Sequence, residues 1–215
     1  MTASRIVLLT AALSVFFNCA PTIIEKPAET QDILSISKMI AKVDHDWVLA
    51  SADTMLNMAL RSVTEAACVR SEGGTHDFYS EGDYWWPNPE DPQGPYMRKD
   101  GMTNPENFVI HRQAMREMSI TVGTLTAAYK LTSDERYAMK AAHHLHSWFI
   151  NPETRMNPNM AYAQAIKGRV PGRGVGLIDG IHFVEPAQAI IILHKAGILS
   201  EDEFLAYESW FSEFL

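Results

Sequence analysis

Apolar residues recur at three- and four-residue steps through most of the chain, which is the spacing of one helix face. No stretch keeps the two-residue alternation of a strand. The pattern predicts helices over 33–43, 47–63, 110–131, 135–150, 178–196 and 200–215. Neighbouring helices are joined by short turns, so we expect an all-α fold built from helical hairpins.

Polar residues mark two of the predicted helix starts. Ser133 or Asp134 can cap the free amides of the helix that follows. Ser200 and Glu203 have the spacing of a capping box, in which each side chain bonds the other residue's backbone amide. These caps fix two hairpin turns from the sequence alone.

Two long segments interrupt the helical pattern, one over 71–107 and the other over 152–176. Both are rich in proline, asparagine and glycine, which favour turns. Long irregular segments are uncommon in compact domains and are usually functional. We therefore expect the function to lie in these two segments.

The N-terminus has the order of charge and hydropathy that is typical of a secretory signal. Arg5 precedes a short apolar run over 6–17, which is too short to span a bilayer comfortably. Cys19 follows directly and could carry the lipid of a bacterial lipoprotein, although cleavage after Ala20 stays open. The alternative is a buried or anchoring N-terminal helix.

The N-terminal pattern predicts a signal peptide or lipoprotein signal over 1–20 and a linker over 21–31. The remaining residues, 32–215, are predicted to form one domain. The same pattern predicts a periplasmic or secreted protein that meets a membrane only through a lipid anchor at Cys19. Without the signal, Cys68 is the one cysteine left, which excludes an internal disulfide.

The composition narrows the class of protein. A chain that is 47% hydrophobic and 20% charged is neither disordered nor a multi-pass membrane protein. The formal net charge of −8 leaves no basic face for phosphates and excludes nucleic acid as a partner. A polyanionic ligand would need a local concentration of positive charge.

The first irregular segment, 71–107, is called the aromatic segment below. It holds Tyr79, Tyr84, Trp85 and Trp86 among carboxylates and turn-forming residues. Aromatic faces beside hydrogen-bonding groups suit pyranose rings, whose C–H faces stack while their hydroxyls need partners. The alternative is that Trp85 and Trp86 only hold the segment against the helices.

The second irregular segment, 152–176, is called the basic segment. Its cations Arg155, Lys167, Arg169 and Arg173 are opposed only by Glu153, a local charge of +3. In an acidic protein this is where an anion would bind. The alternative is a solvated basic segment that pairs with the acidic residues of the aromatic segment.

Several motifs resemble the alginate lyase domain family, whose members cleave polyuronates such as alginate or glucuronan. They are HDFYSEGDYWWP (76–87), GPYMRKDGMTNPENF (94–108), His111-Arg112, Ala128-Tyr129, Trp148-Phe149, TRMNPN (154–159), YAQAI (162–166) and GRGVGLID (172–179). The resemblance runs from about residue 45 to the end of the chain. It implies an (α/α) toroid whose inner helices line a substrate groove.

The reaction implied by the resemblance is β-elimination, which removes the proton beside a uronate carboxylate and expels the glycosidic oxygen. The site must neutralise that carboxylate and supply a base and an acid, usually tyrosine and histidine. The family's Asn-His pair is absent from this sequence, and its tyrosine has no match here. The catalytic residues are therefore unknown in this chain.

The last predicted helix ends at Leu215 without a glycine cap, and its aromatic face lacks a partner in the pattern. We expect a truncated C-terminus, an incomplete toroid and an inactive fragment, with the catalytic pair beyond Leu215.

The resemblance points to substrate-binding residues in both segments and at the start of the third helix. We expect stacking from Tyr84, Trp85 and Trp86, carboxylate contacts from Arg112, Gln164 and Arg173, a hydrogen bond from Tyr162, and a site or structural role for His111. No cofactor is implied. His143 and His146 are three apart on a helix but lack a third ligand, so no metal is predicted either.

Two other functions stay open. Asp77, Glu81 and Asp83 could serve as the paired acids of a glycoside hydrolase on the same toroid fold. A non-catalytic sugar-binding protein would bind the acidic polysaccharide without turnover.

Overall fold

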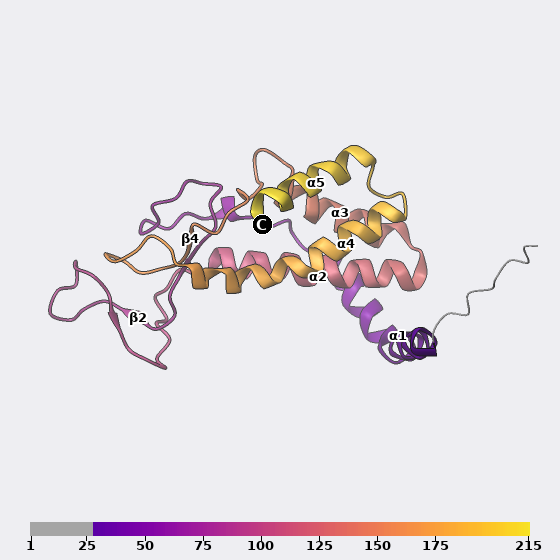
Figure 1. Ribbon diagram of the computed structural model, residues 1–215, viewed down its shortest axis with the longest axis horizontal. Coiled ribbons are helices and arrows are strands. Elements are labelled where there is room, and N and C mark those ends of the chain that lie inside the picture. The colour runs from indigo at the N-terminus through magenta and orange to yellow at the C-terminus, as the bar shows by residue number, and fades with distance from the viewer. Residues whose placement is uncertain (1–27) are drawn as a thin grey trace, which may run out of the picture. The chain divides into compact units, whose positions relative to one another are not determined.

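The computed structural model describes residues 28–215 (Figure 1). The predicted signal and residues 21–27 of the predicted linker lie outside the described residues. The chain divides into two compact units, Met1–Ile40 and Ala41–Leu215. Helix α1, Ala28–Met55, begins in the first unit and ends in the second.

All other described elements belong to the second unit. In chain order they are η1 (Val63–Glu65), β1 (Tyr79–Glu81), β2 (Trp85–Trp86), β3 (Met97–Arg98), α2 (Ile110–Thr132), α3 (Glu135–Phe149), β4 (Tyr162–Ala165), η2 (Gly174–Phe183), α4 (Val184–Lys195) and α5 (Glu201–Phe214).

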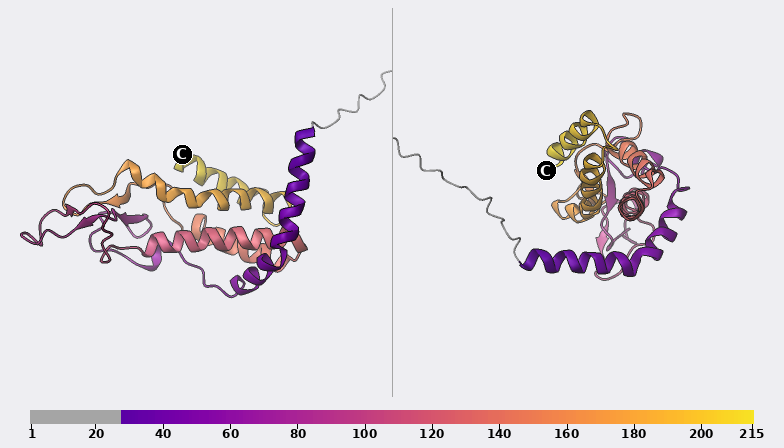
Figure 2. Two further views of the ribbon diagram at one scale, coloured as in Figure 1. Left: turned by 90° about the horizontal axis from the view of Figure 1, so that it is seen from below. Right: turned by 90° about the vertical axis from the view of Figure 1, so that its right-hand side faces the viewer.

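Helices α2 and α3 form the predicted hairpin (Figure 1 and Figure 2). Ser133 adopts the left-handed conformation with φ of 58°, and its amide donates to the Tyr129 carbonyl over 2.7 Å. Asp134 then caps α3 by accepting the Arg136 amide. The predicted start of this helix at Ser133 or Asp134 is confirmed, because local capping chemistry is sufficient to set the turn.

The next helix starts differently from the prediction. The segment expected as one helix over 178–196 is a 3-10 helix, η2, followed by α4. Together they are long and apolar enough to cross a membrane by length and composition alone. Phe183, Ile190 and Leu193 are buried in the protein core, as in a packed helix of a globular domain.

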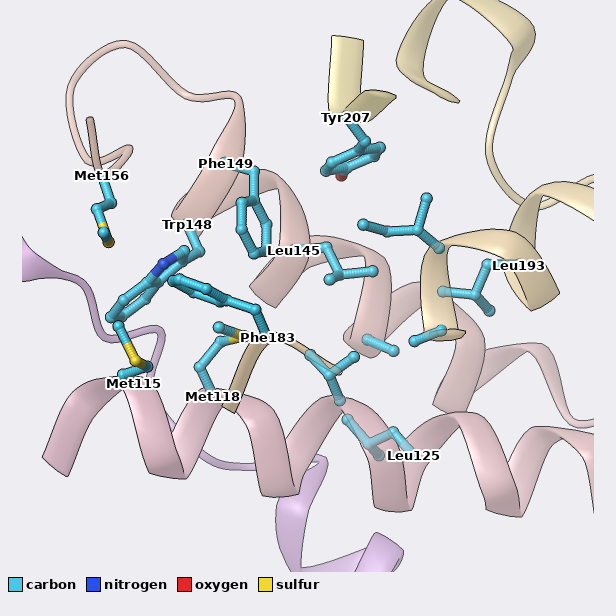
Figure 3. Close-up of a cluster of buried hydrophobic side chains, with 14 of the residues drawn as sticks. Met115, Met118, Leu125, Leu145, Trp148, Phe149, Met156, Phe183, Leu193 and Tyr207 are labelled. Atoms are coloured by element: carbon cyan, nitrogen blue, oxygen red, sulfur yellow. The ribbon is translucent and has the colours of Figure 1, made fainter. Parts of the chain in front are cut away.

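Helix α5 begins with the predicted capping box, since Ser200 accepts the Glu203 amide and Glu203 accepts the Ser200 amide. The expectation that its aromatic face lacks a partner is wrong. Tyr207 and Trp210 are buried, and the Trp210 ring lies 4.7 Å edge-to-face from Phe149. Phe149, Phe183 and Tyr207 converge in the core between the helices (Figure 3).

The predicted helix over 47–63 is confirmed only for residues 47–55, and it is continuous with the helix predicted before it. Residues 28–55 form one helix, and the chain leaves it after Met55. Lys140 of α3 donates to the Met58 carbonyl over 2.6 Å, and Ser62 caps η1 by accepting the Thr64 amide. These contacts satisfy backbone groups that would otherwise favour a longer helix.

The prediction of an all-α fold needs a correction, because the helical fold also contains two small sheets. Strand β1 pairs in parallel with β4, and β2 pairs antiparallel with β3. Each strand has two to four residues, too few for an alternating pattern to be visible in the sequence. The β1–β4 pair joins the aromatic segment to the basic segment.

Candidate functional site

The β1–β4 pair contains a bulge at Gln164. Tyr79 faces Tyr162 and Glu81 faces Ala165, so β4 has one residue more than β1 between the paired positions. Gln164 takes up the extra length with a φ of +56°, which is uncommon for any residue other than glycine. Bulges re-aim side chains and often lie beside functional sites.

Arg173 is fixed on Gln164. Its Nε donates to the Gln164 carbonyl over 2.7 Å, and its Nη2 donates to the Gln164 side-chain oxygen over 3.2 Å. The Arg173 amide also donates to the Ala163 carbonyl. Two residues predicted to contact a carboxylate are therefore side by side.

Trp85 lies close to Arg173 at the backbone of Gly82. A Cβ on Gly82 would lie 2.7 Å from Arg173 Nη2 and 2.7 Å from Trp85 Cδ1. A side chain on residue 82 would clash with both groups, so the guanidinium and the indole lie against the same backbone position. The aromatic and basic segments thus meet at Gly82 through Trp85 and Arg173.

The cations of the basic segment are not paired with the acids of the aromatic segment. Within residues 28–215, none of Arg155, Lys167, Arg169 and Arg173 forms a salt bridge with a carboxylate. The alternative of a basic segment neutralised by its acidic neighbour is wrong. Its positive charge is available to an anion.

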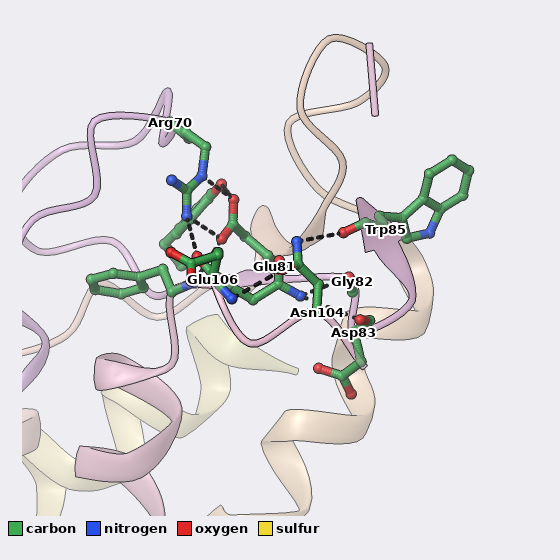
Figure 4. A network of polar contacts seen from close by, with 10 residues as sticks. Arg70, Glu81, Gly82, Asp83, Trp85, Asn104 and Glu106 are labelled. Atoms are coloured by element: carbon green, nitrogen blue, oxygen red, sulfur yellow. Dashed lines mark hydrogen bonds and ion pairs between the residues drawn. The ribbon is translucent and has the colours of Figure 1, made fainter. Parts of the chain in front are cut away.

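The acids of the aromatic segment pair with other arginines. Arg70 donates to both carboxylate oxygens of Glu81, over 2.5 and 2.6 Å, and the Phe108 amide donates to Glu81 as well (Figure 4). Burial raises the pKa of Glu81, but the hydrogen bonds from Arg70 and Phe108 outweigh it, and the pKa is lowered overall. Glu81 is therefore a buried anion that holds the segment in place.

Arg112 also forms ion pairs that hold the aromatic segment in place. Its Nη1 donates to Asp83 over 2.9 Å, and its Nε lies 3.4 Å from an Asp179 oxygen. Asp179 in turn accepts the Ser80 hydroxyl over 2.7 Å. Two carboxylates surround the guanidinium, so Arg112 connects α2 to β1 and η2, with its charge already compensated.

The remaining aromatic residues are placed differently from one another. Trp86 donates from its indole to the Met102 carbonyl over 2.8 Å, with Lys99 Nζ 4.7 Å above the ring. Tyr84 is 40% exposed at the surface. In Figure 4 the Trp85 ring points away from the Arg70–Glu81 pair, while its carbonyl accepts from Asn104.

His111 and Tyr162 have mainly local contacts. His111 is buried, accepts the Tyr79 amide at Nδ1 and lies 2.8 Å from the Ala66 carbonyl at Nε2. Its pKa is lowered chiefly by burial, so the ring is neutral and both nitrogens are used. Tyr162 is half-buried against Gly73, where a Cβ would lie 2.7 Å from its ring.

The sequence reasoning did not single out Arg169 as a partner of Trp85. The Arg169 guanidinium lies 5.2 Å from the centroid of the Trp85 ring, within cation–π distance, and its Nε donates to the Tyr96 carbonyl. Only the charge count of the basic segment hinted at this residue. Among the described residues, no cluster of three or more metal-ligating side chains is present.

The sequence matches the alginate lyase family over residues 62–215. The chain belongs to the alginate lyase family. Its structure is similar to the crystal structure of an alginate lyase from Bacteroides ovatus, with a TM-score of 0.72 and 37% sequence identity. The alignment covers 79% of this chain and 45% of that one, so this alginate lyase family chain spans less than half the length of that protein. No curated protein matches the sequence.

Proposed function

We propose that this protein acts as a polysaccharide lyase that cleaves an acidic polyuronate, alginate or glucuronan, by β-elimination. The observation that carries the proposal is Arg173, a cation without a carboxylate partner in the described chain, held beside Trp85 and Gln164. Membership of the alginate lyase family supports the reaction class. We also propose an (α/α) toroid for the whole domain and export directed by residues 1–20.

Arg173 and Gln164 have the chemistry to neutralise a uronate carboxylate. After its bonds to Gln164, Arg173 still has Nη1 without a hydrogen bond to any described residue. Gln164 accepts Arg173 at its side-chain oxygen, which leaves its amide nitrogen to donate to a ligand. Both groups are donors of the kind that stabilises the negative charge growing on a uronate carboxylate when the neighbouring proton is removed.

The distribution of carboxylates favours a lyase over a glycoside hydrolase. A hydrolase needs one carboxyl group that stays protonated near neutral pH and a second that is free to react. Glu81 is held ionised by Arg70, and Asp83 accepts Arg112. Asp77 accepts Asn157 and the Gly74 amide. All three candidate acids are engaged in holding the aromatic segment.

The test is to incubate the full-length protein with alginate and with glucuronan. A lyase produces unsaturated uronates, which absorb in the ultraviolet. New reducing ends without that absorbance would instead indicate the hydrolase. Binding of the polymer without either product would indicate a sugar-binding protein and overturn the proposed reaction.

A further inference from the structure

A cationic cavity lies beside the β1–β4 pair, which contributes Tyr79 and Ala165 to its lining. It has a volume of about 270 Å³ and is lined by Arg70, Glu72, Tyr79, Lys167, Arg169 and neighbouring backbone. Pockets for drug-sized ligands are typically about 300–1,000 Å³. A cavity of this size suits a single sugar unit or a smaller group.

This cavity lies on the opposite face of β1 from the Ser80 contacts. Ser80 donates to Asp179 on one face, whereas Tyr79 donates to Glu81 on the other, toward Arg70. Adjacent strand residues point to opposite faces, so the two sets of contacts are separate. We call this cavity the Lys167 pocket.

Its charge balance favours an anion. Arg70 is neutralised by Glu81, whereas Lys167 and Arg169 lack a carboxylate partner among the described residues. Lys167 Nζ lies 5.6 Å from the centroid of the Tyr96 ring, so its neighbour is an aromatic ring and not a carboxylate. Glu72 is the opposing charge, and it is exposed, which leaves the pocket with a net positive charge.

Trp85 connects the two cationic sites. Arg169 lies 5.2 Å from the Trp85 ring centroid, and Arg173 lies beside the Cδ1 edge of the same ring at Gly82. A polyuronate carries one carboxylate on every sugar, so a chain that stacks on Trp85 presents separate carboxylates to the two sides of this residue.

We propose that the Lys167 pocket binds a second carboxylate of the same polyuronate chain, on a sugar next to the one held by Arg173. The inference rests on the proposed function. In this proposal Lys167 and Arg169 attract the second carboxylate of the polysaccharide, and the negative charge of Glu72 weakens that attraction. The pocket therefore contributes to the choice of a polyanion over a neutral glycan.

The experiment measures binding of a glucuronan hexasaccharide to the 215-residue chain by calorimetry, with a carboxyl-reduced hexasaccharide as the neutral probe. We expect Lys167→Gln to weaken binding of the acidic probe about fivefold or more, because a close charge partner is lost. We expect Glu72→Gln to tighten it by about twofold or more, since an opposing charge is removed. Lys130→Gln, an exposed lysine near the end of α2, is the matched control and should leave the affinity unchanged.

The outcomes separate the two proposals. If Arg173→Gln abolishes binding while Lys167→Gln and Glu72→Gln match the wild type, the Lys167 pocket is not a binding site and the proposed function stands. If the wild type binds the neutral probe as tightly as the acidic one, or binds neither, both proposals are overturned. Circular dichroism of each variant establishes that the fold is retained.

Discussion

Arg173 donates to both the main-chain and the side-chain oxygen of Gln164, so one residue fixes the guanidinium without neutralising it. A carboxylate in the place of Gln164 would fix the arginine equally well but cancel its charge. An amide oxygen orients the cation and leaves its attraction for a ligand anion intact. This arrangement is what an anion-binding arginine requires.

Replacing Arg173 by lysine should weaken binding of oligouronates by about tenfold or more. Lysine lacks the planar fork that bonds Gln164 and a carboxylate at the same time. Calorimetry with an acidic oligosaccharide measures the loss. Arg155→Gln, an exposed cation of the same basic segment, is the control and should bind as the wild type does. If only the net charge mattered, Arg173→Lys would bind as the wild type does and Arg155→Gln would be the weaker variant.

Replacing Glu81 by glutamine should destabilise the protein by about 1–3 kcal/mol at pH 7, because it removes the carboxylate that pairs with the half-buried Arg70 and accepts the Phe108 amide. The pKa of Glu81 is lowered in the folded state, from an ordinary value of 4.5. Its stabilisation is therefore fully present above pH 4.5 and is lost as the pH falls through the folded pKa. Urea unfolding at pH 7 and below pH 4.5 measures the free energy of unfolding of the wild type and of Glu81→Gln.

In that experiment the difference between wild type and Glu81→Gln should shrink as the pH falls below 4.5. A difference that stayed constant with pH would contradict an ionised Glu81. Glu90→Gln changes an exposed acid of the same segment and provides the baseline.

The strained backbone of Gln164 can be measured with two substitutions. Gln164→Gly and Gln164→Ala both remove the amide group, so they differ only in the cost of the positive φ. We expect the glycine variant to be about 1 kcal/mol more stable than the alanine variant, since alanine is disfavoured in the left-handed region. Thermal unfolding compares them. Equal stabilities, or a more stable alanine variant, would mean that the bulge relaxes on substitution.

His144 should make the protein sensitive to mild acid. Burial, with Lys140 and His143 nearby, lowers the pKa of His144 from 6.5 to about 4, and its Nε2 has no hydrogen-bond partner. Between these values the unfolded chain binds a proton that the folded chain does not. Stability should therefore fall as the pH drops from 6.5 to 4, by roughly 3 kcal/mol in total.

His144→Leu should lose this part of the pH dependence. His143→Gln, an exposed neighbour on α3, should keep most of it, because burial is the largest cause of the lowered pKa. Denaturant unfolding of the three proteins at several pH values provides the comparison. If the unfolding free energy of the wild type and of His144→Leu changed equally with pH, other groups would cause the acid sensitivity.

The helices were predictable where local chemistry decides them. Asp134 and Ser200 cap helices by contacts within their own turns, and both caps were readable in the sequence. The end of α1 was not predictable from the sequence. The backbone carbonyl of Met58, just beyond that end, is bonded by Lys140, which is 82 residues away in the chain. The short strands were missed because each has only two to four residues, and because the partners β1 and β4 come from different segments.

The candidate site was predictable in residue type but not in pairing. Charge counting found Arg173, the cluster of aromatic residues pointed to Trp85, and the family motifs added Gln164. Nothing local distinguished Arg112, which is surrounded by Asp83 and Asp179, from Arg173, which is not. The role of Gly82 as the meeting point also depends on three-dimensional contacts, because its neighbours come from both segments.

Tyr79 and Tyr162 are partners in a parallel pair, with the α2–α3 hairpin between them in the chain. Closing such a distant pairing costs more conformational entropy than forming a helical hairpin, so local contacts are expected to form first. The helical scaffold would then exist before the two segments meet. Mutations that slow or weaken this closure should yield chains with near-native helix content and no affinity for ligand.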